Sequence, residues 1–297
     1  MPSPETVPLS ELDTVWNFDD PAASERAFQV VAGRARVESD GAFLGEALTQ
    51  LARAQGLRGR FDDARRTLDE AEDALRRDDR RARVRLLLER GRVANSSGAD
   101  GRGSASFLEA WGLARAAGED ALAVDAAHML GIVEPPDEAW SWNERAMELA
   151  RASPDPRAQR WVGSLANNMG WARHEASRYD DALELFRVAL DERRATGSAD
   201  QIRIARWCVA RCLRSLGRVD EALAEQHALA GELAAESLDD GYVDEEVAEC
   251  LLALGRSEEA RPSFARAAEL LAVDPAVTPE RLERLRAAGA NASQTEP

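Results

Sequence analysis

Small and bulky apolar residues recur along most of this chain with the period of an amphipathic helix. The stretch 163–196 shows the pattern most fully, through Met169, Gly170, Tyr179, Ala182, Phe186 and Ala189. At 3.6 residues per turn, this spacing predicts two amphipathic helices joined by a turn near residues 175–178. The small residues allow the two helices to approach closely, and the aromatic residues fill the space between helix pairs.

The same pattern recurs along the chain at a nearly constant interval. The small position falls at Ala52, Gly91, Gly131, Gly170, Ala210 and Ala248, with intervals of 39, 40, 39, 40 and 38 residues. Nineteen residues after each stand Ala71, Ala110, Ala150, Ala189, Leu229 and Ala267. Sixteen residues after each stand Leu68, Phe107, Met147, Phe186, Gln226 and Phe264. Columns that agree in one register predict six helix pairs over about residues 45–275.

This arrangement of small and large residues resembles the tetratricopeptide repeat family, in six degenerate repeats. The resemblance implies an all-α fold, a right-handed α-solenoid of tetratricopeptide-like helix-turn-helix repeats with N- and C-terminal capping helices. The interval exceeds the family's usual ~34 residues, which predicts about one added helical turn per repeat. We expect a tail and an N-terminal capping helix in residues 1–40, six repeats in 41–276, and a C-terminal capping helix and tail in 277–297.

Turn and cap residues support this division. Inter-helix turns are predicted at Gly59, Gly98, Gly101, Ser177, Gly217 and Gly255. In the third repeat, Pro135 and Pro136 should end the first helix early. Asp20-Pro21 and Thr278-Pro279 are typical starts of the two capping helices. We expect the second of these helices to end at Gly289, and residues 1–11 to form a loose tail.

Charge and composition exclude several classes of function. The net charge of −16 would repel nucleic acid, so we expect no nucleic-acid partner. All 38 basic residues are arginine. The absence of lysine excludes a Walker-type phosphate loop, a Schiff base and a lysine-attached cofactor, and we predict no cofactor. No membrane-spanning run or signal peptide is recognisable, and three scattered cysteines fit a reducing compartment, so we expect a cytoplasmic, bacterial protein.

Candidate catalytic and metal sites are weak. The three histidines show no metalloprotease or nucleophile-elbow spacing, and we predict no catalytic residues. Cys208 and Cys212 share a helix face but lack a second pair of ligands, so packing is the favoured interpretation over metal binding. Asp239-Asp240-Gly241 lacks the spacing of a calcium loop and is typical of a turn and helix N-cap.

In the tetratricopeptide family, the first helices of the pairs line a groove that usually binds peptides. Transferred to this sequence, that expectation gives the predicted groove residues Arg92, Asn95, His128, Asn167, Trp171, His174, Trp207, Arg211 and Arg214. Arginine, asparagine and tryptophan together suit a ligand that carries a carboxylate, such as an acidic segment or C-terminus of a protein. The carboxylate clamp of chaperone-binding members is not reproduced, because Ile204 and Cys208 occupy two of its positions.

The resulting hypothesis is a non-enzymatic scaffold that binds a peptide or partner protein in the groove between the third and fifth repeats. An alternative is a regulatory receptor that senses a peptide or small effector. A third hypothesis, an enzyme, would require His128 or His174 as a general base. The sequence does not decide whether acids within the chain, such as Asp125, already occupy the groove arginines.

Overall fold

The computed structural model describes residues 9–38, 40–98 and 103–290, and within these ranges every regular element is a helix. The chain forms two compact units, Met1–Val162 and Gly163–Pro297. The predicted turn at Gly101 and most of the two predicted tails lie outside the described ranges. None of the described helices combines the length and apolar character needed to cross a membrane.

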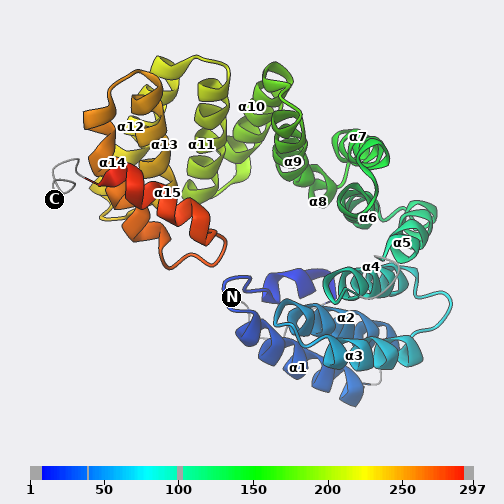
Figure 1. Ribbon diagram of the computed structural model, residues 1–297. Coiled ribbons are helices and arrows are strands. Elements are labelled where there is room, and N and C mark those ends of the chain that lie inside the picture. Colours follow the sequence, from blue (N-terminus) through cyan, green and yellow to red (C-terminus); the bar gives the residue numbers. More distant parts are fainter. Residues whose placement is uncertain (1–8, 39, 99–102, 291–297) are drawn as a thin grey trace. The chain divides into compact units, whose positions relative to one another are not determined.

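The first unit begins with a 3-10 helix, followed by helices that each pack against their neighbours in the chain (Figure 1). These elements are η1 (Leu9–Val15), α1 (Pro21–Glu38), α2 (Gly41–Leu57), α3 (Phe61–Ala74), α4 (Arg80–Ser96), α5 (Ser104–Ala117), α6 (Asp120–Val133), α7 (Pro136–Ala152) and α8 (Pro156–Gln159). The even-numbered helices α2, α4 and α6 are the first members of three pairs, as the sequence register predicts.

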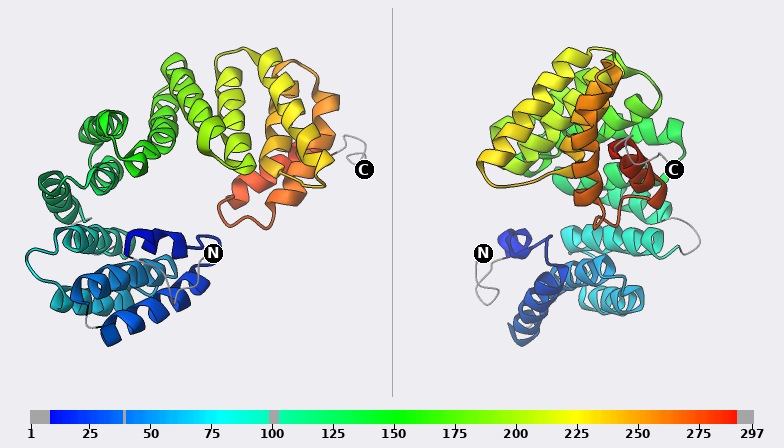
Figure 2. Two further views of the ribbon diagram at one scale, coloured as in Figure 1. Left: turned by 180° about the vertical axis from the view of Figure 1, so that it is seen from behind. Right: turned by 60° about the vertical axis from the view of Figure 1, so that its left-hand side comes forward.

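The second unit contains three further pairs and a terminal helix. Its elements are α9 (Trp161–Glu175), α10 (Tyr179–Thr196), α11 (Ala199–Ser215), α12 (Val219–Ala235), α13 (Gly241–Ala253), α14 (Ser257–Leu271) and α15 (Pro279–Gly289). Figure 2 shows α12, α13 and α14, yellow to orange, stacked side by side. The first helices are α9, α11 and α13. The boundary between the units falls near the start of α9, and the division of the chain into caps and one repeat array stays a prediction.

Close packing confirms the predicted register. A Cβ atom added to Gly170 would lie 2.7 Å from Cε1 of Phe186, so only glycine lets this ring pack against α9. Gly91 holds the same relation to the buried ring of Phe107. Ala182, in the small position of α10, is fully buried. The residues that define the repeat therefore build the contact within these two helix pairs.

The predicted turns and caps are also confirmed. A left-handed φ occurs at Gly59, Gly98, Gly217 and Gly255 and, without glycine, at Ser177 with φ 58°. The prolines of the third repeat separate α6, which ends at Val133, from α7. Asp20 accepts a hydrogen bond from the Ala23 amide at 2.9 Å, and Thr278 accepts one from the Arg281 amide at 3.2 Å.

The prediction of a loose tail as far as Glu11 is wrong from Leu9 onward, because η1 begins there. Leu12 and Val15 are buried in the same apolar cluster as Phe28 of α1 and Phe43 of α2. Burial of these two side chains, three residues apart on one helical face, supplies the hydrophobic free energy that orders the segment.

Candidate functional site

The first-helix face, defined here as the surface formed by the first helices of the pairs, carries internal ion pairs in the first unit. Arg92 on α4 donates to Glu89, and it donates to Asp125 on α6 at 2.5 Å. Burial alone would raise the pKa of Asp125, but Arg92 and Arg53 outweigh it and hold the pKa below its usual value. Arg92, which was predicted to face a ligand, is therefore neutralised within the chain by Asp125.

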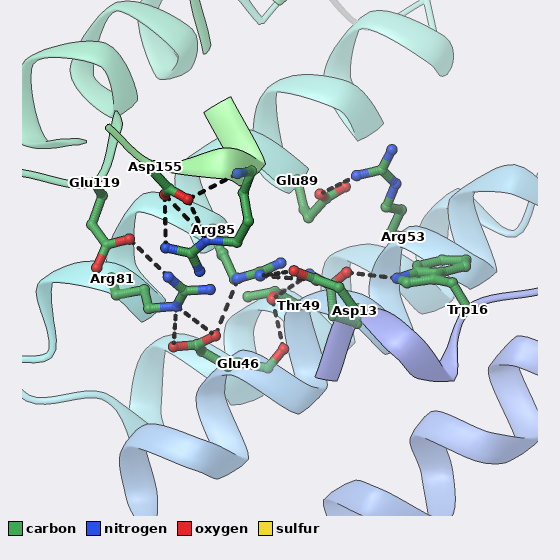
Figure 3. A network of polar contacts seen from close by, with 12 residues as sticks. Asp13, Trp16, Glu46, Thr49, Arg53, Arg81, Arg85, Glu89, Glu119 and Asp155 are labelled. Carbon is green, nitrogen blue, oxygen red and sulfur yellow. Dashed lines mark hydrogen bonds and ion pairs between the residues drawn. The ribbon is translucent and has the colours of Figure 1, made fainter. Parts of the chain in front are cut away.

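The N-terminal segment lies over the same face. Asp13 accepts two hydrogen bonds from Arg85, each 2.9 Å long, and the Trp16 indole donates to Gln50 at 2.8 Å (Figure 3). Arg53 stacks over the Trp16 ring with its guanidinium carbon 5.7 Å from the ring centroid. Neither Asp13 nor its contact with Arg85 was identified from the sequence. The helical spacing of Leu12, Val15 and Trp16 was the available signal for an ordered segment.

His128 and Asn95 are half-buried on the same unit. The His128 ring packs against Trp161, with 5.3 Å between the ring centroids. Burial lowers the pKa of His128, so the imidazole is neutral at pH 7.

In the second unit, the structure brings together the remaining predicted groove residues on α9 and α11. Trp171 lies at the centre of an aromatic cluster, with its ring centroid 6.1 Å from that of Trp207 and 5.2 Å from that of His174. Both tryptophans are half-buried. We call the set Asn167, Trp171, His174, Trp207, Arg211 and Arg214 the Trp–Arg surface.

The two arginines of the Trp–Arg surface share one buried carboxylate. Nε of Arg211 lies 2.9 Å from Glu246 of α13, and Nε of Arg214 lies 2.8 Å from the other oxygen of that carboxylate. Two guanidinium groups against one carboxylate leave an excess of positive charge. Burial lowers the pKa of His174 and both arginines lower it further, as a locally positive potential requires.

Asn167 lies beside a small pocket between α9 and α11. Its amide oxygen accepts a hydrogen bond from the Cys208 thiol at 3.5 Å. A pocket of about 170 Å³ opens next to it and is lined by Gly163, Ser164, Asn167, Asn168, Ala189, Arg193, Gln201, Ile204 and Ala205. Among the described residues, the amide nitrogen of Asn167 donates no hydrogen bond, which leaves it open to a ligand in this pocket.

One contact resembles a nucleophile and its base. Nε2 of His174 lies 2.9 Å from Oγ of Ser215, a pairing that a separation of 41 positions in the chain hides in the sequence. Ser215 also donates to the backbone oxygen of Arg211 at 3.3 Å and accepts from the Arg211 side chain at 3.0 Å. A catalytic triad needs a third group to orient the imidazole, and no hydrogen bond from the described residues supplies one. The geometry is that of a satisfied structural hydroxyl.

Cys208 and Cys212 are buried side chains suited to core packing and not to nucleophilic reactivity. Burial raises the pKa of Cys208 to about 12 and that of Cys212 to about 11, so both are protonated at neutral pH. Across the described residues, no group of three or more histidine, cysteine, aspartate or glutamate side chains is arranged to hold a metal ion. Asp240 accepts from the Tyr242 amide at 2.9 Å as the N-cap of α13, as the sequence indicates.

No protein-family model matches the chain, and no curated protein matches it significantly. Solved structures do match it. A tetratricopeptide repeat protein from Parabacteroides merdae is 15% identical with a TM-score of 0.51, and the match covers 95% of this chain and 99% of that one. NprR in complex with its cognate peptide NprX is 17% identical with a TM-score of 0.53, over 94% of this chain and 80% of NprR.

A third match is the signal transduction ATPase with numerous domains, with a tetratricopeptide repeat sensor, from Pyrococcus horikoshii. It is 13% identical with a TM-score of 0.65, and the match covers 94% of this chain but only 46% of the ATPase chain. At these identities the likeness concerns the fold. Together with the register of six close-packed helix pairs, it identifies the chain as a protein with the tetratricopeptide repeat fold.

Proposed function

We propose that this protein is a non-enzymatic interaction module that binds a peptide or an extended segment of a partner protein on the Trp–Arg surface. The observation that carries the proposal is the convergence of two half-buried tryptophans, an asparagine and two arginines on adjacent first helices. Tryptophan and arginine are the residue types that dominate the energetics of protein interfaces.

Each group has a distinct part in such a contact. Trp171 and Trp207 provide flat apolar walls whose remaining exposed surface a ligand would bury. Asn167 offers directional hydrogen bonds to a peptide backbone. Glu246 already engages Nε and Nη2 of Arg214 and Nε of Arg211, so Nη1 of Arg214 and Nη2 of Arg211 are the donors left for a second carboxylate.

The local charge favours an acidic ligand. Glu246 neutralises one of the two guanidinium charges, and the other is left for a carboxylate that arrives from outside. Because Glu246 is held in place by both arginines, the donors are already oriented before a ligand binds. Preorganisation of this kind reduces the entropy lost on binding. The preferred partner in this proposal carries an acidic segment or a free C-terminus.

The first unit contributes less to the proposal. Arg92 is engaged by Glu89 and Asp125, and His128 packs on Trp161, so a ligand there would have to displace contacts that the chain makes internally. The fold comparison is compatible with peptide binding, since NprR was solved with its cognate peptide bound and has a similar fold.

The test is peptide binding by the full chain and by matched arginine variants. Immobilised peptides of about ten residues, with acidic, neutral or basic sequences and free or amidated C-termini, are probed with the wild type, Arg211→Gln and Arg214→Gln. The control is Arg218→Gln, which removes an arginine from an exposed ion pair with Glu221 outside the Trp–Arg surface. Single substitutions are chosen because each leaves Glu246 with one guanidinium partner.

Acidic peptides should bind best, and each variant on the Trp–Arg surface should weaken their binding by roughly tenfold relative to the control. Thermal melting of all three variants checks that the fold persists. The proposal fails if acidic peptides bind no better than neutral ones, or if Arg211→Gln and Arg214→Gln bind as the control does. A partner captured by crosslinking to the wild type can then be assigned to this surface by the same variants.

A further inference from the structure

An apolar pocket opens on the second unit beside the first half of α11, whereas Arg211 and Arg214 lie on the second half of that helix. It has a volume of about 510 Å³ and lies between the first half of α11, the end of α12 and the start of α13. Its apolar lining comes from Ile204, Trp207, Leu229, Leu233, Leu238, Tyr242 and Val243. The volume lies within the range of roughly 300–1,000 Å³ that is typical of ligand pockets.

The walls of the pocket are fixed, and its mouth is exposed. The Trp207 indole donates to the backbone oxygen of Tyr242 at 3.1 Å, and the Tyr242 hydroxyl donates to Asp274 at 2.9 Å. Ile204 is 60% exposed and Leu238 is 44% exposed at the mouth. Leaving two large aliphatic side chains in water beside a pre-formed apolar hollow has a free-energy cost that an apolar ligand group would remove.

Acidic side chains dominate the rim. Asp200, Asp239 and Asp240 line the pocket, against Arg203 as its one cationic lining residue. Arg203 is itself engaged by Asp200 and, at 3.0 Å, by Glu236. The next turn of α13 adds Asp244.

The excess of carboxylates also affects the pKa of a neighbouring residue on α13. Burial raises the pKa of Asp244, and Asp239 and Asp240 raise it further although Arg266 opposes them. The ion pair of Arg266 with Asp244 spans 3.1 Å, and the same guanidinium also binds Asp239. The rim therefore has a negative potential that a cation close to it would relieve.

We propose that this acid-rimmed pocket binds a bulky apolar side chain that stands next to a lysine or arginine in a partner's peptide segment. The apolar group fills the space between Trp207, Leu229 and Leu233, and the neighbouring cation lies against the carboxylates at the mouth. This inference rests on the proposed function and names the anchor of the ligand.

The two subsites together define the order of groups along the ligand. Ile204 and Trp207 precede Arg211 and Arg214 on one stripe of α11, about 10 Å apart at 1.5 Å per residue. An extended peptide covers that distance in about three residues. A ligand that satisfies both ends carries a basic–apolar anchor and, about three residues away, an acidic group.

Isothermal titration calorimetry with a synthetic peptide tests the inference on the full chain. The probe is an acetylated, amidated peptide with phenylalanine between two lysines, a short polar spacer and two glutamates. Three altered probes replace phenylalanine by alanine, both lysines by glutamine, or both glutamates by glutamine. The protein variants are Ile204→Ser and Leu238→Ser at the pocket mouth, with Leu252→Ser as a control, because Leu252 is exposed to a similar extent (46%) on α13 but does not line the pocket.

Loss of the phenylalanine, or either pocket substitution, should weaken binding by roughly tenfold, and loss of the lysines should weaken it severalfold. Leu252→Ser should bind as the wild type does. Both pocket residues are exposed, so neither serine variant should unfold the protein, and melting curves verify this.

Two outcomes overturn the inference while leaving the proposed function intact. In the first, binding depends on the glutamates and on Arg211 but not on phenylalanine, Ile204 or Leu238. In the second, sedimentation shows self-association of the protein that Ile204→Ser abolishes, so that a second copy of the chain occupies the pocket. Absence of binding by the probe and by every acidic peptide of the earlier array refutes the proposed function as well.

Discussion

The fully buried Gln226 on α12 offers the sharpest test of how the repeats are held together. Its side chain occupies the position that phenylalanine holds at residues 107, 186 and 264, and its exposed fraction is 0%. Neither the amide nitrogen nor the amide oxygen has a hydrogen-bond partner among the described residues. A buried amide without partners has lost its hydration and gained no hydrogen bond in return. We predict that Gln226→Leu, and Gln226→Met as a closer match in shape, stabilise the protein.

The expected size follows from this burial. Leaving a buried polar group unpaired costs about 1–3 kcal/mol, and the aliphatic replacement removes that cost at similar volume. A change of 1 kcal/mol shifts the melting temperature of a unit of this size by roughly 3 °C, so a rise of about 3–9 °C is expected. Gln50 provides the matched control. It is equally buried, at 1% exposed, but it accepts a hydrogen bond from Trp16 at 2.8 Å. Gln50→Leu should therefore lower the midpoint.

The wild type and the three variants are compared by thermal and urea unfolding, followed by far-ultraviolet circular dichroism. Because repeat arrays do not always unfold in a single step, midpoints are compared between variants rather than extrapolated free energies. The reasoning would be refuted if Gln226→Leu and Gln226→Met both lowered the melting temperature by roughly 3 °C or more, which corresponds to about 1 kcal/mol. The amide of Gln226 would then have to be hydrogen-bonded in solution.

Two further predictions concern the repeat register and the N-terminal segment. Ala182→Glu places a carboxylate at a fully buried contact between α9 and α10 and should cost several kcal/mol, about 3 or more, seen as a large drop of the melting midpoint; an unchanged midpoint would contradict the register. Asp13→Asn should cost no more than about 1 kcal/mol at pH 7. Partial burial would raise the pKa of Asp13, but Arg85 holds it below its usual value, and because the carboxylate is 55% exposed, solvent screens the pair. A lowered pKa stabilises the fold above about pH 5 and loses that effect as the pH falls through the folded value, so the difference between the two proteins should shrink toward pH 3. A difference that persisted in acid would show that the Asp13 carboxylate is not what Arg85 requires.

Much of the fold could be predicted from the sequence because the repeat is a local device. Gly170 and Phe186 lie within one helix pair, and their contact depends only on helix geometry and on the sizes of the side chains. The turn at Ser177 and the break at Pro135 and Pro136 are equally local, since each is fixed by the conformations that a few adjacent residues can adopt. Periodicity and turn chemistry were therefore sufficient to place these elements.

The candidate site could be predicted only in part. The resemblance to the tetratricopeptide family predicted that Trp171 and Trp207 line one groove, and the structure places their rings 6.1 Å apart. The partner of Arg211 and Arg214 is Glu246, more than thirty residues further along the chain, and no local pattern points to it. The contact between His174 and Ser215 was hidden for the same reason.

The sequence alone determined the helix pairs, their register, their turns and which helix of each pair is the first. These features follow from residue size and backbone preference over a few turns of chain. The tertiary structure alone decided which charges on those helices remain available. Asp13 and Asp125 neutralise arginines in the first unit, Glu246 neutralises half of the pair in the second, and Asp200 and Asp239 give the apolar pocket its acidic rim. Electrostatic energy depends on distances between groups far apart in the chain, and the stacking of one repeat on the next sets those distances.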